Sequence, residues 1–172
     1  MASLVRALRR ERGLTLEELG GLTGLTKSYL SKVERELSTP SIAVALKIAE
    51  ALDVDVSRLF VGETGRSAIT IDRIGDRQAG ARLQPLGADM LGKVMSPFVL
   101  RPTAEFVKHE PTHTGQEFIF VHSGTIELHY DGEEFELETG ESAYLDATRA
   151  HRLRSTSESE AQVVIVATAY RP

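Results

Sequence analysis

The spacing of apolar residues changes from a helical period to an alternating one about a third of the way along the chain. In the first 60 residues, apolar side chains recur every three to four positions, which is the period of an amphipathic helix. From Ser67 onward, apolar and polar residues alternate in short runs typical of strands with one buried face. The pattern predicts an α+β chain of two domains: helices in residues 1–61, a small polar linker at 62–67, and strands in 68–172.

Two short helices joined by a tight turn are predicted in the stretch from Thr15 to Arg35. Thr15 is a good N-cap for the first of them. Three leucines then recur at the spacing of one helical face: Leu16, Leu19 and Leu22. Gly24 ends this helix, because glycine takes the left-handed conformation past a helix end without steric cost. With one helix before this pair and two after it, the first domain is expected to hold five helices.

The second helix of the pair has an apolar face and a basic, hydroxyl-rich face. Leu30 and Val33 can bury against the preceding helix. The candidate DNA-binding residues lie on or beside the other face: Thr26, Lys27, Ser28, Ser31, Lys32 and Arg35. Lysine, arginine and short donors suit phosphate oxygens and the guanine edge, so the pattern indicates a helix that reads a major groove. An ordinary helical bundle with a solvated charged face is the alternative.

The motifs that follow carry a family resemblance. After Arg35 come Pro40-Ser41, an Ala-x-x-Leu pattern at Ala49–Leu52, and Leu59-Phe60. This order resembles the phage-repressor-like (XRE) helix-turn-helix family. The resemblance implies a lambda-repressor-like DNA-binding domain, in which four of the candidates face bases and two lie nearer the DNA backbone. The four are Lys27, Ser28, Lys32 and Arg35, and the two are Thr26 and Ser31. Leu16 and Gly20 depart from the usual Gln and Ala of the family.

Composition narrows the protein class. The net charge of −5 divides unevenly: residues 1–60 hold 9 basic and 8 acidic side chains, and residues 61–172 hold 11 and 17. A near-neutral first domain can still bind DNA if its positive charges converge on one surface. The absence of cysteine excludes disulfides and thiolate metal sites. The sequence has no long uncharged apolar run and no signal-peptide core, so we expect a cytoplasmic protein without membrane contact.

The second domain is predicted to be a small antiparallel barrel or sandwich. Asp131-Gly132 between two alternating runs is a strong hairpin signal. Nine strand-like runs are predicted: 68–71, 82–86, 94–100, 117–121, 125–130, 133–137, 142–145, 151–154 and 162–169. Many short strands with regular turns are typical of this architecture.

Within the strands, His113, Glu117 and His151 form the candidate chemical site. Residues four apart on a strand share a face, so His113 and Glu117 are expected to point inward together. The surrounding motifs resemble the two motifs of the cupin family, in which these positions are metal ligands. Pro111 replaces the first histidine ligand of that family. Two imidazoles and a carboxylate suit Fe(II) and tolerate other divalent metals such as Zn, Ni or Mn. The alternative is a metal-free polar cluster that lines an effector pocket.

The joined architecture resembles a group of bacterial regulators with a helix-turn-helix and a cupin (jelly roll) barrel. The resemblance implies a homodimer, held together by the barrel domain, that reads an inverted-repeat operator in double-stranded DNA. It also implies that the barrel senses a small-molecule effector. A mononuclear non-haem iron epoxidase that combines the same two domains is the competing, catalytic hypothesis. A plain binding or storage barrel is a third. The outward donors from Lys27 to Arg35 favour the regulator, because an enzyme has no need of them.

Overall fold

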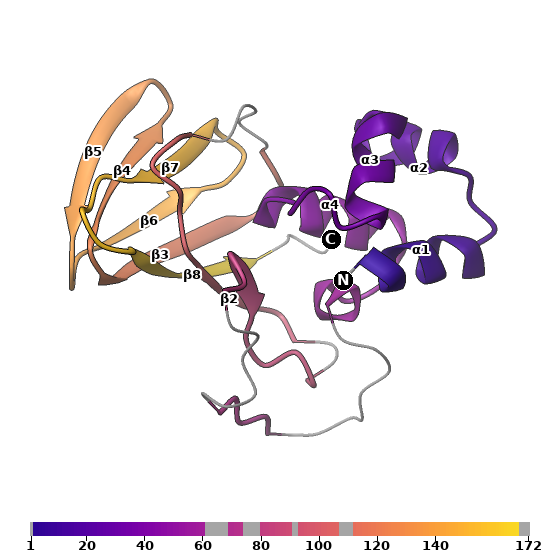
Figure 1. Ribbon diagram of the computed structural model, residues 1–172, viewed down its shortest axis with the longest axis horizontal. Coiled ribbons are helices and arrows are strands. Elements are labelled where there is room, and N and C mark those ends of the chain that lie inside the picture. The colour runs from indigo at the N-terminus through magenta and orange to yellow at the C-terminus, as the bar shows by residue number, and fades with distance from the viewer. Residues whose placement is uncertain (1, 61–68, 74–79, 91–92, 107–111, 169–172) are drawn as a thin grey trace. The chain divides into compact units, whose positions relative to one another are not determined.

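The computed structural model describes residues 2–60, 69–73, 80–90, 93–106 and 112–168, and the chain divides into two compact units. The first comprises Met1–Ile71 and Gly87–Lys93, and the second comprises Asp72–Leu86 and Val94–Pro172. The linker expected at 62–67 lies outside the described residues. The helices of the first unit (Figure 1) are α1 (Ala2–Glu11), α2 (Leu16–Thr23), α3 (Lys27–Glu34), α4 (Ile42–Ala51) and the 3₁₀-helix η1 (Val56–Leu59).

The prediction of five α-helices was wrong, since the described part of the first unit has four. The expected fifth is the 3₁₀-helix η1, whose four residues close with an Arg58 N–H bond to the Asp55 carbonyl oxygen. A segment this short gains too few α-type hydrogen bonds to offset the cost of starting an α-helix, so a single 3₁₀ turn forms instead. Leu59 is nevertheless fully buried, as its place in the pattern predicted.

The buried face of α2 also differs from the expected one. Leu19 is fully buried, but Leu22 is 61% exposed, and Thr23 takes the inner position one residue later. The Thr23 hydroxyl donates to the Leu19 carbonyl oxygen at 2.7 Å, so its burial leaves no unpaired donor. The structure explains why glycine occupies position 20, where alanine is usual in the family. A Cβ on Gly20 would lie 2.8 Å from the Leu25 carbonyl oxygen, which is too close. Glycine therefore lets the turn approach α2 closely.

The second unit consists of two antiparallel sheets. Its eight strands within the described residues are β1 (Leu83–Pro85), β2 (Ser96–Leu100), β3 (Gln116–Ser123), β4 (Thr125–Tyr130), β5 (Glu133–Glu138), β6 (Ser142–Asp146), β7 (His151–Ser155) and β8 (Gln162–Thr168). One sheet has the order β1-β2-β8-β3-β6, and the other has the order β5-β4-β7 (Figure 1). Their apolar faces supply the core, which includes Phe98, Ile119, Ile126 and Val163.

A closed barrel is not formed by the described strands, so the barrel prediction needs correction to two sheets with open edges. β5 is one such edge, and its residues are mostly exposed glutamates that oppose the pairing of a further strand. The strand expected at 68–71 is also absent from its described residues 69–71, where Ile69 and Ile71 are exposed. The other eight predicted runs each overlap an observed strand. None of the helices in the described part of the chain has the length and apolar character needed to span a bilayer.

Candidate functional site

The helix pair in the first unit is built by local capping. The Thr15 hydroxyl accepts from the Glu18 N–H, and the Glu18 carboxylate accepts from the Thr15 N–H at 2.7 Å, which forms a capping box at the start of α2. Gly24 ends α2 with a φ of 69°. The Thr26 hydroxyl then accepts from the Tyr29 N–H and caps α3. These contacts join residues that are close in the sequence, which is why the helix pair could be predicted from the sequence.

The outward face of α3 carries the side chains predicted to meet DNA. Leu30 and Val33 are buried on its inner face. Five of the six candidates are exposed, namely Thr26, Lys27, Ser28, Lys32 and Arg35, and the sixth, Ser31, is half-buried. The Arg35 Nε donates to the Ser31 carbonyl oxygen at 3.2 Å, and the Lys27 ammonium pairs with the Glu17 carboxylate. The binding role of these residues stays a prediction, but their placement leaves a continuous face of donors open to a partner.

A buried ion pair fixes α3 against α1. The Arg9 guanidinium donates to both carboxylate oxygens of Glu34, at 2.6 and 3.1 Å, and its third contact is the Leu14 carbonyl oxygen at 2.6 Å. Both side chains are almost fully buried. The hydrogen bond with Glu34 raises the pKa of Arg9. The pair therefore sets the position of the helix that presents the donors, although sequence analysis did not find it. Glu34 follows Leu30 by four residues on the buried face, and a carboxylate there signals a buried partner.

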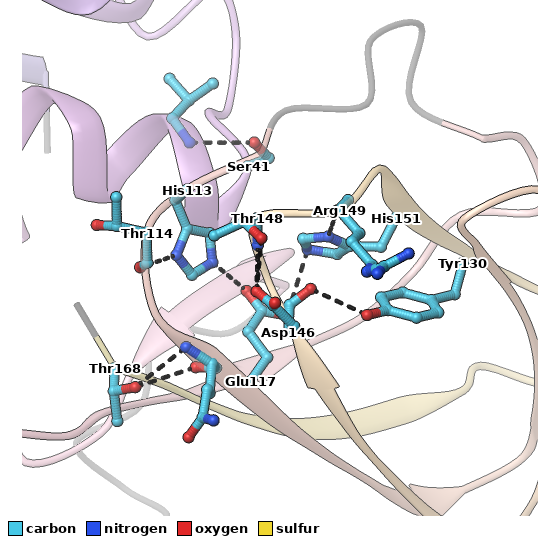
Figure 2. Close-up of polar contacts among 12 residues, drawn as sticks. Ser41, His113, Thr114, Glu117, Tyr130, Asp146, Thr148, Arg149, His151 and Thr168 are labelled. Carbon is cyan, nitrogen blue, oxygen red and sulfur yellow. Dashed lines mark hydrogen bonds and ion pairs between the residues drawn. The ribbon is translucent and has the colours of Figure 1, made fainter. Parts of the chain in front are cut away.

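In the second unit, His113, Glu117 and His151 come together between the two sheets (Figure 2). The Nε2 atom of His113 lies 2.7 Å from one oxygen of Glu117, and the Nε2 atom of His151 lies 3.6 Å from the other. All three side chains are nearly buried, and the two rings meet edge to face with centroids 6.1 Å apart. One potential ligand atom from each residue lies within 4.8 Å of the others, so one ion could contact all three.

His113 reaches this cluster in a different way from the one expected. It precedes β3, which begins at Gln116, and the chain bends through Thr114 and Gly115, where Gly115 has a φ of 104°. On a straight strand, residues four apart lie about 13 Å from each other, too far for this contact. The His113 N–H also donates to the Ala147 carbonyl oxygen at 3.1 Å, which holds the bend in place. The bend, and not a shared strand face, brings the two side chains together.

The hydrogen bonds of the cluster leave both imidazoles oriented as ligands. The Nδ1 atom of His113 lies 2.9 Å from the Thr114 carbonyl oxygen, and that of His151 lies 2.8 Å from the Arg149 carbonyl oxygen. A carbonyl oxygen accepts only, so each Nδ1 carries a hydrogen. Each Nε2 faces the carboxylate: it donates to Glu117 when the ring is doubly protonated, and its lone pair is open to a cation when the ring is neutral. Burial alone would raise the pKa of Glu117, but hydrogen bonds from doubly protonated imidazoles lower it to about 2. An ionised carboxylate facing two Nε2 atoms is a donor set that a divalent cation satisfies.

A second cluster, formed by Glu127, His129 and Glu134, lacks this orientation. The guanidinium of Arg152 donates to Nδ1 of His129 at 3.3 Å, so Nε2 carries the hydrogen and donates to Glu127 at 2.6 Å. Arg154 occupies the other oxygen of Glu127 at 2.6 Å. Because the ring nitrogens and the Glu127 carboxylate are engaged within the network, we assign it a structural role. The sequence separated the two clusters only through the resemblance to the cupin motifs, which include His113, Glu117 and His151 and leave out the second cluster.

Two known families match the chain. A Helix-turn-helix family model matches residues 5–59, and a Cupin domain family model matches residues 98–167. The first match contains the capped helix pair, and the second contains all three residues of the buried cluster. Both predicted resemblances are therefore confirmed at the level of the family.

Several curated relatives are named transcriptional regulators. HTH-type transcriptional regulator SutR of Escherichia coli (strain K12) is 26% identical over 159 residues, which cover 92% of this chain and 88% of SutR. DdrOP3 of Deinococcus deserti is 32% identical over 105 residues, which cover 58% of this chain and 74% of that regulator. SlrR of Bacillus subtilis (strain 168) is 37% identical over 62 residues, and the chain spans 41% of its length. These names agree with the predicted regulator rather than with an enzyme.

One solved structure shows the same fold, and a second aligns only weakly. An HTH_3 family transcriptional regulator from Vibrio cholerae aligns over 99% of this chain and 95% of its own, with a TM-score of 0.64 and 24% identity. Hydroxypropylphosphonic acid epoxidase from S. wedmorenis aligns over 96% of this chain and 95% of its own, but its TM-score of 0.42 and 19% identity are too low to bear on activity. With a helix-turn-helix followed by a cupin domain, the chain belongs to the XRE-type helix-turn-helix transcriptional regulators.

Proposed function

We propose that this regulator reads an inverted-repeat operator through α3 and responds to a small effector held at the His113, Glu117 and His151 cluster. The observation that carries the DNA part is the outward face of α3, whose basic and hydroxyl side chains stay exposed while Leu30 and Val33 are buried. Donors on a helix fixed by its inner face suit base edges and phosphates in a major groove.

Arg35→Ala should weaken binding to a selected operator by about 1–3 kcal/mol if the guanidinium reads a base edge. The measurement is affinity for operator and random duplexes at one fixed salt concentration. Arg10→Ala is the matched control, because it removes the same charge from an exposed position on α1 and should leave the preference for operator unchanged. Wild-type protein that binds operator and random duplex equally would contradict the proposal.

For the effector, the cluster offers three potential ligands to a divalent cation. The two Nε2 atoms and the Glu117 carboxylate would hold the ion, which supplies a Lewis-acidic anchor when bound. The remaining coordination positions are open to a carboxylate, amine or hydroxyl of a small molecule. If effector occupancy changes operator affinity, the operator must change effector affinity by the same factor. This reciprocity is what makes the cluster a sensor in the proposal.

We infer that the homodimer forms through the outer face of the five-stranded sheet. Tyr144 and Phe118 are adjacent there across β6 and β3, and Val166 adjoins Phe118 from β8. Tyr144 is 68% exposed and Phe118 is 37% exposed. A solvated antiparallel sheet normally turns polar side chains outward, so an apolar outer face favours a covering layer. Phe118, Tyr144 and Val166 carry no charge, and Asp146, two residues from Tyr144, is the exposed charged residue on this face of β6. A second copy can therefore meet the apolar centre across a two-fold axis if the axis keeps the two Asp146 side chains apart.

The double variant Phe118→Glu with Tyr144→Glu should convert the full-length dimer to a monomer, because the two-fold axis would bring four new carboxylates together. Light scattering over a concentration series measures the change. Phe135→Glu is the matched control: Phe135 is 42% exposed on β5 of the other sheet, and its replacement should leave the dimer intact. A double variant that remains dimeric, with the control also dimeric, would place the interface elsewhere.

A further inference from the structure

One candidate DNA-contacting side chain already has a protein partner. Lys27 is the first residue of α3, and its ammonium pairs with the carboxylate of Glu17 from the first turn of α2. Both side chains are largely exposed. The hydrogen bond from Lys27 lowers the pKa of Glu17, whose carboxylate is ionised at neutral pH in any case. Lys27 therefore faces an anion before any duplex approaches it.

The surroundings make Glu17 the natural competitor for this lysine. The neighbouring carboxylate of Glu18 is committed to the capping box, where it accepts from both the N–H and the hydroxyl of Thr15. The Glu17 carboxylate extends to α3, where it pairs with Lys27, and it also accepts from its own backbone N–H in the first turn of α2. A carboxylate presents the same kind of acceptor oxygens to an ammonium as a phosphate or a guanine edge does. The ammonium has three N–H donors, so each one that Glu17 engages is a donor that the duplex does not use.

We propose that Glu17 is an intramolecular competitor of DNA for Lys27, and that it lowers the affinity of the regulator for duplexes. The inference rests on the proposed function, because it takes α3 as the DNA-binding helix. Exposed ion pairs are weak, so the duplex can displace Glu17, but the displacement subtracts from the gain of each Lys27 contact. The ion pair therefore reduces DNA affinity. On binding, a phosphate oxygen or a base edge replaces Glu17 as the acceptor for Lys27.

The test is a double-mutant cycle on the full-length protein. Glu17→Gln removes the charge and keeps the shape, and we expect it to raise duplex affinity roughly two- to five-fold at low salt, with a smaller gain as salt is added. In a Lys27→Met background the same change should give no gain, because the residue that Glu17 restrains is absent. Glu50→Gln, at an exposed position near the end of α4, changes the net charge equally and should have no effect.

Each duplex gives a separate result. A gain on both random duplex and selected operator supports the proposal with a phosphate as the new partner of Lys27, and a gain on operator alone supports it with a base edge. A gain that persists with Lys27→Met, or an equal gain from Glu50→Gln, would overturn it, since general charge would then explain the effect. Failure of the proposed function looks different: wild-type protein would show no operator preference, while the random-duplex cycle would still report on Glu17.

Discussion

Glu34→Ala will destabilise the helical unit by about 3–5 kcal/mol, the cost typical of removing one partner from a buried ion pair. Arg9 donates to both oxygens of Glu34, and both side chains are almost fully buried. Without the carboxylate, the guanidinium would remain buried and would keep its hydrogen bond to the Leu14 carbonyl oxygen. The change in the free energy of unfolding can be measured by urea denaturation, with far-UV circular dichroism to follow the helices.

The double variant Arg9→Met with Glu34→Leu is the informative companion. Apolar residues of similar volume often replace a buried ion pair without loss of stability, so the double variant should recover most of the loss. The exposed pair of Arg12 and Asp53 gives the matched control. Asp53→Asn keeps a residue that tolerates the φ of 49° at this position, and it should cost far less, because solvent screens that pair. A small effect of Glu34→Ala would show that the buried pair does not position α3.

Glu117→Gln will lower divalent-metal affinity by at least about 100-fold. Loss of a residue that hydrogen-bonds to a metal ligand costs up to about 100-fold, and the loss of a ligand itself should cost at least as much. The amide keeps the size of the carboxylate but removes the charge that faces both imidazoles. The measurement is metal content after purification, followed by competition with a chelator for Fe(II), Zn, Ni and Mn. Wild-type protein should retain one ion per chain.

His129→Gln serves as the matched control, because His129 belongs to the cluster whose hydrogen bonds are satisfied without a cation. It should leave metal affinity unchanged. If wild-type protein binds none of the four metals, the His113 cluster is a polar lining of the effector pocket. If the Fe(II) form instead turns over O₂ with a substrate, loses this turnover on His113→Ala and shows no specific DNA binding, the chain is an enzyme and the proposal fails.

The helix pair could be predicted closely because its determinants are local. Thr15, Gly24 and Thr26 act on backbone groups within a few residues of themselves, so the sequence carries nearly the whole signal. The alternation that predicted the strands is equally local. The sequence did not predict the exposure of Leu22, because a two-turn helix can bury its residues at i+3 or those at i+4. The surface against which α2 packs selects Thr23 over Leu22.

The sequence alone determined most of the helices and strands, apart from the 3₁₀-helix η1 and the run at 68–71. It also determined where the candidate DNA-binding helix begins and which three residues could form the buried cluster. These follow from periodicity, caps and motif spacing, all of which act over short distances along the chain. Tertiary structure decided what depends on distant contacts: the division into two sheets, the Arg9 pairing with Glu34, and the hydrogen bonds that orient the Nε2 atoms of His113 and His151 toward Glu117. The reason is physical, since the direction in which a ring nitrogen points is set by acceptors that only the folded chain brings near it.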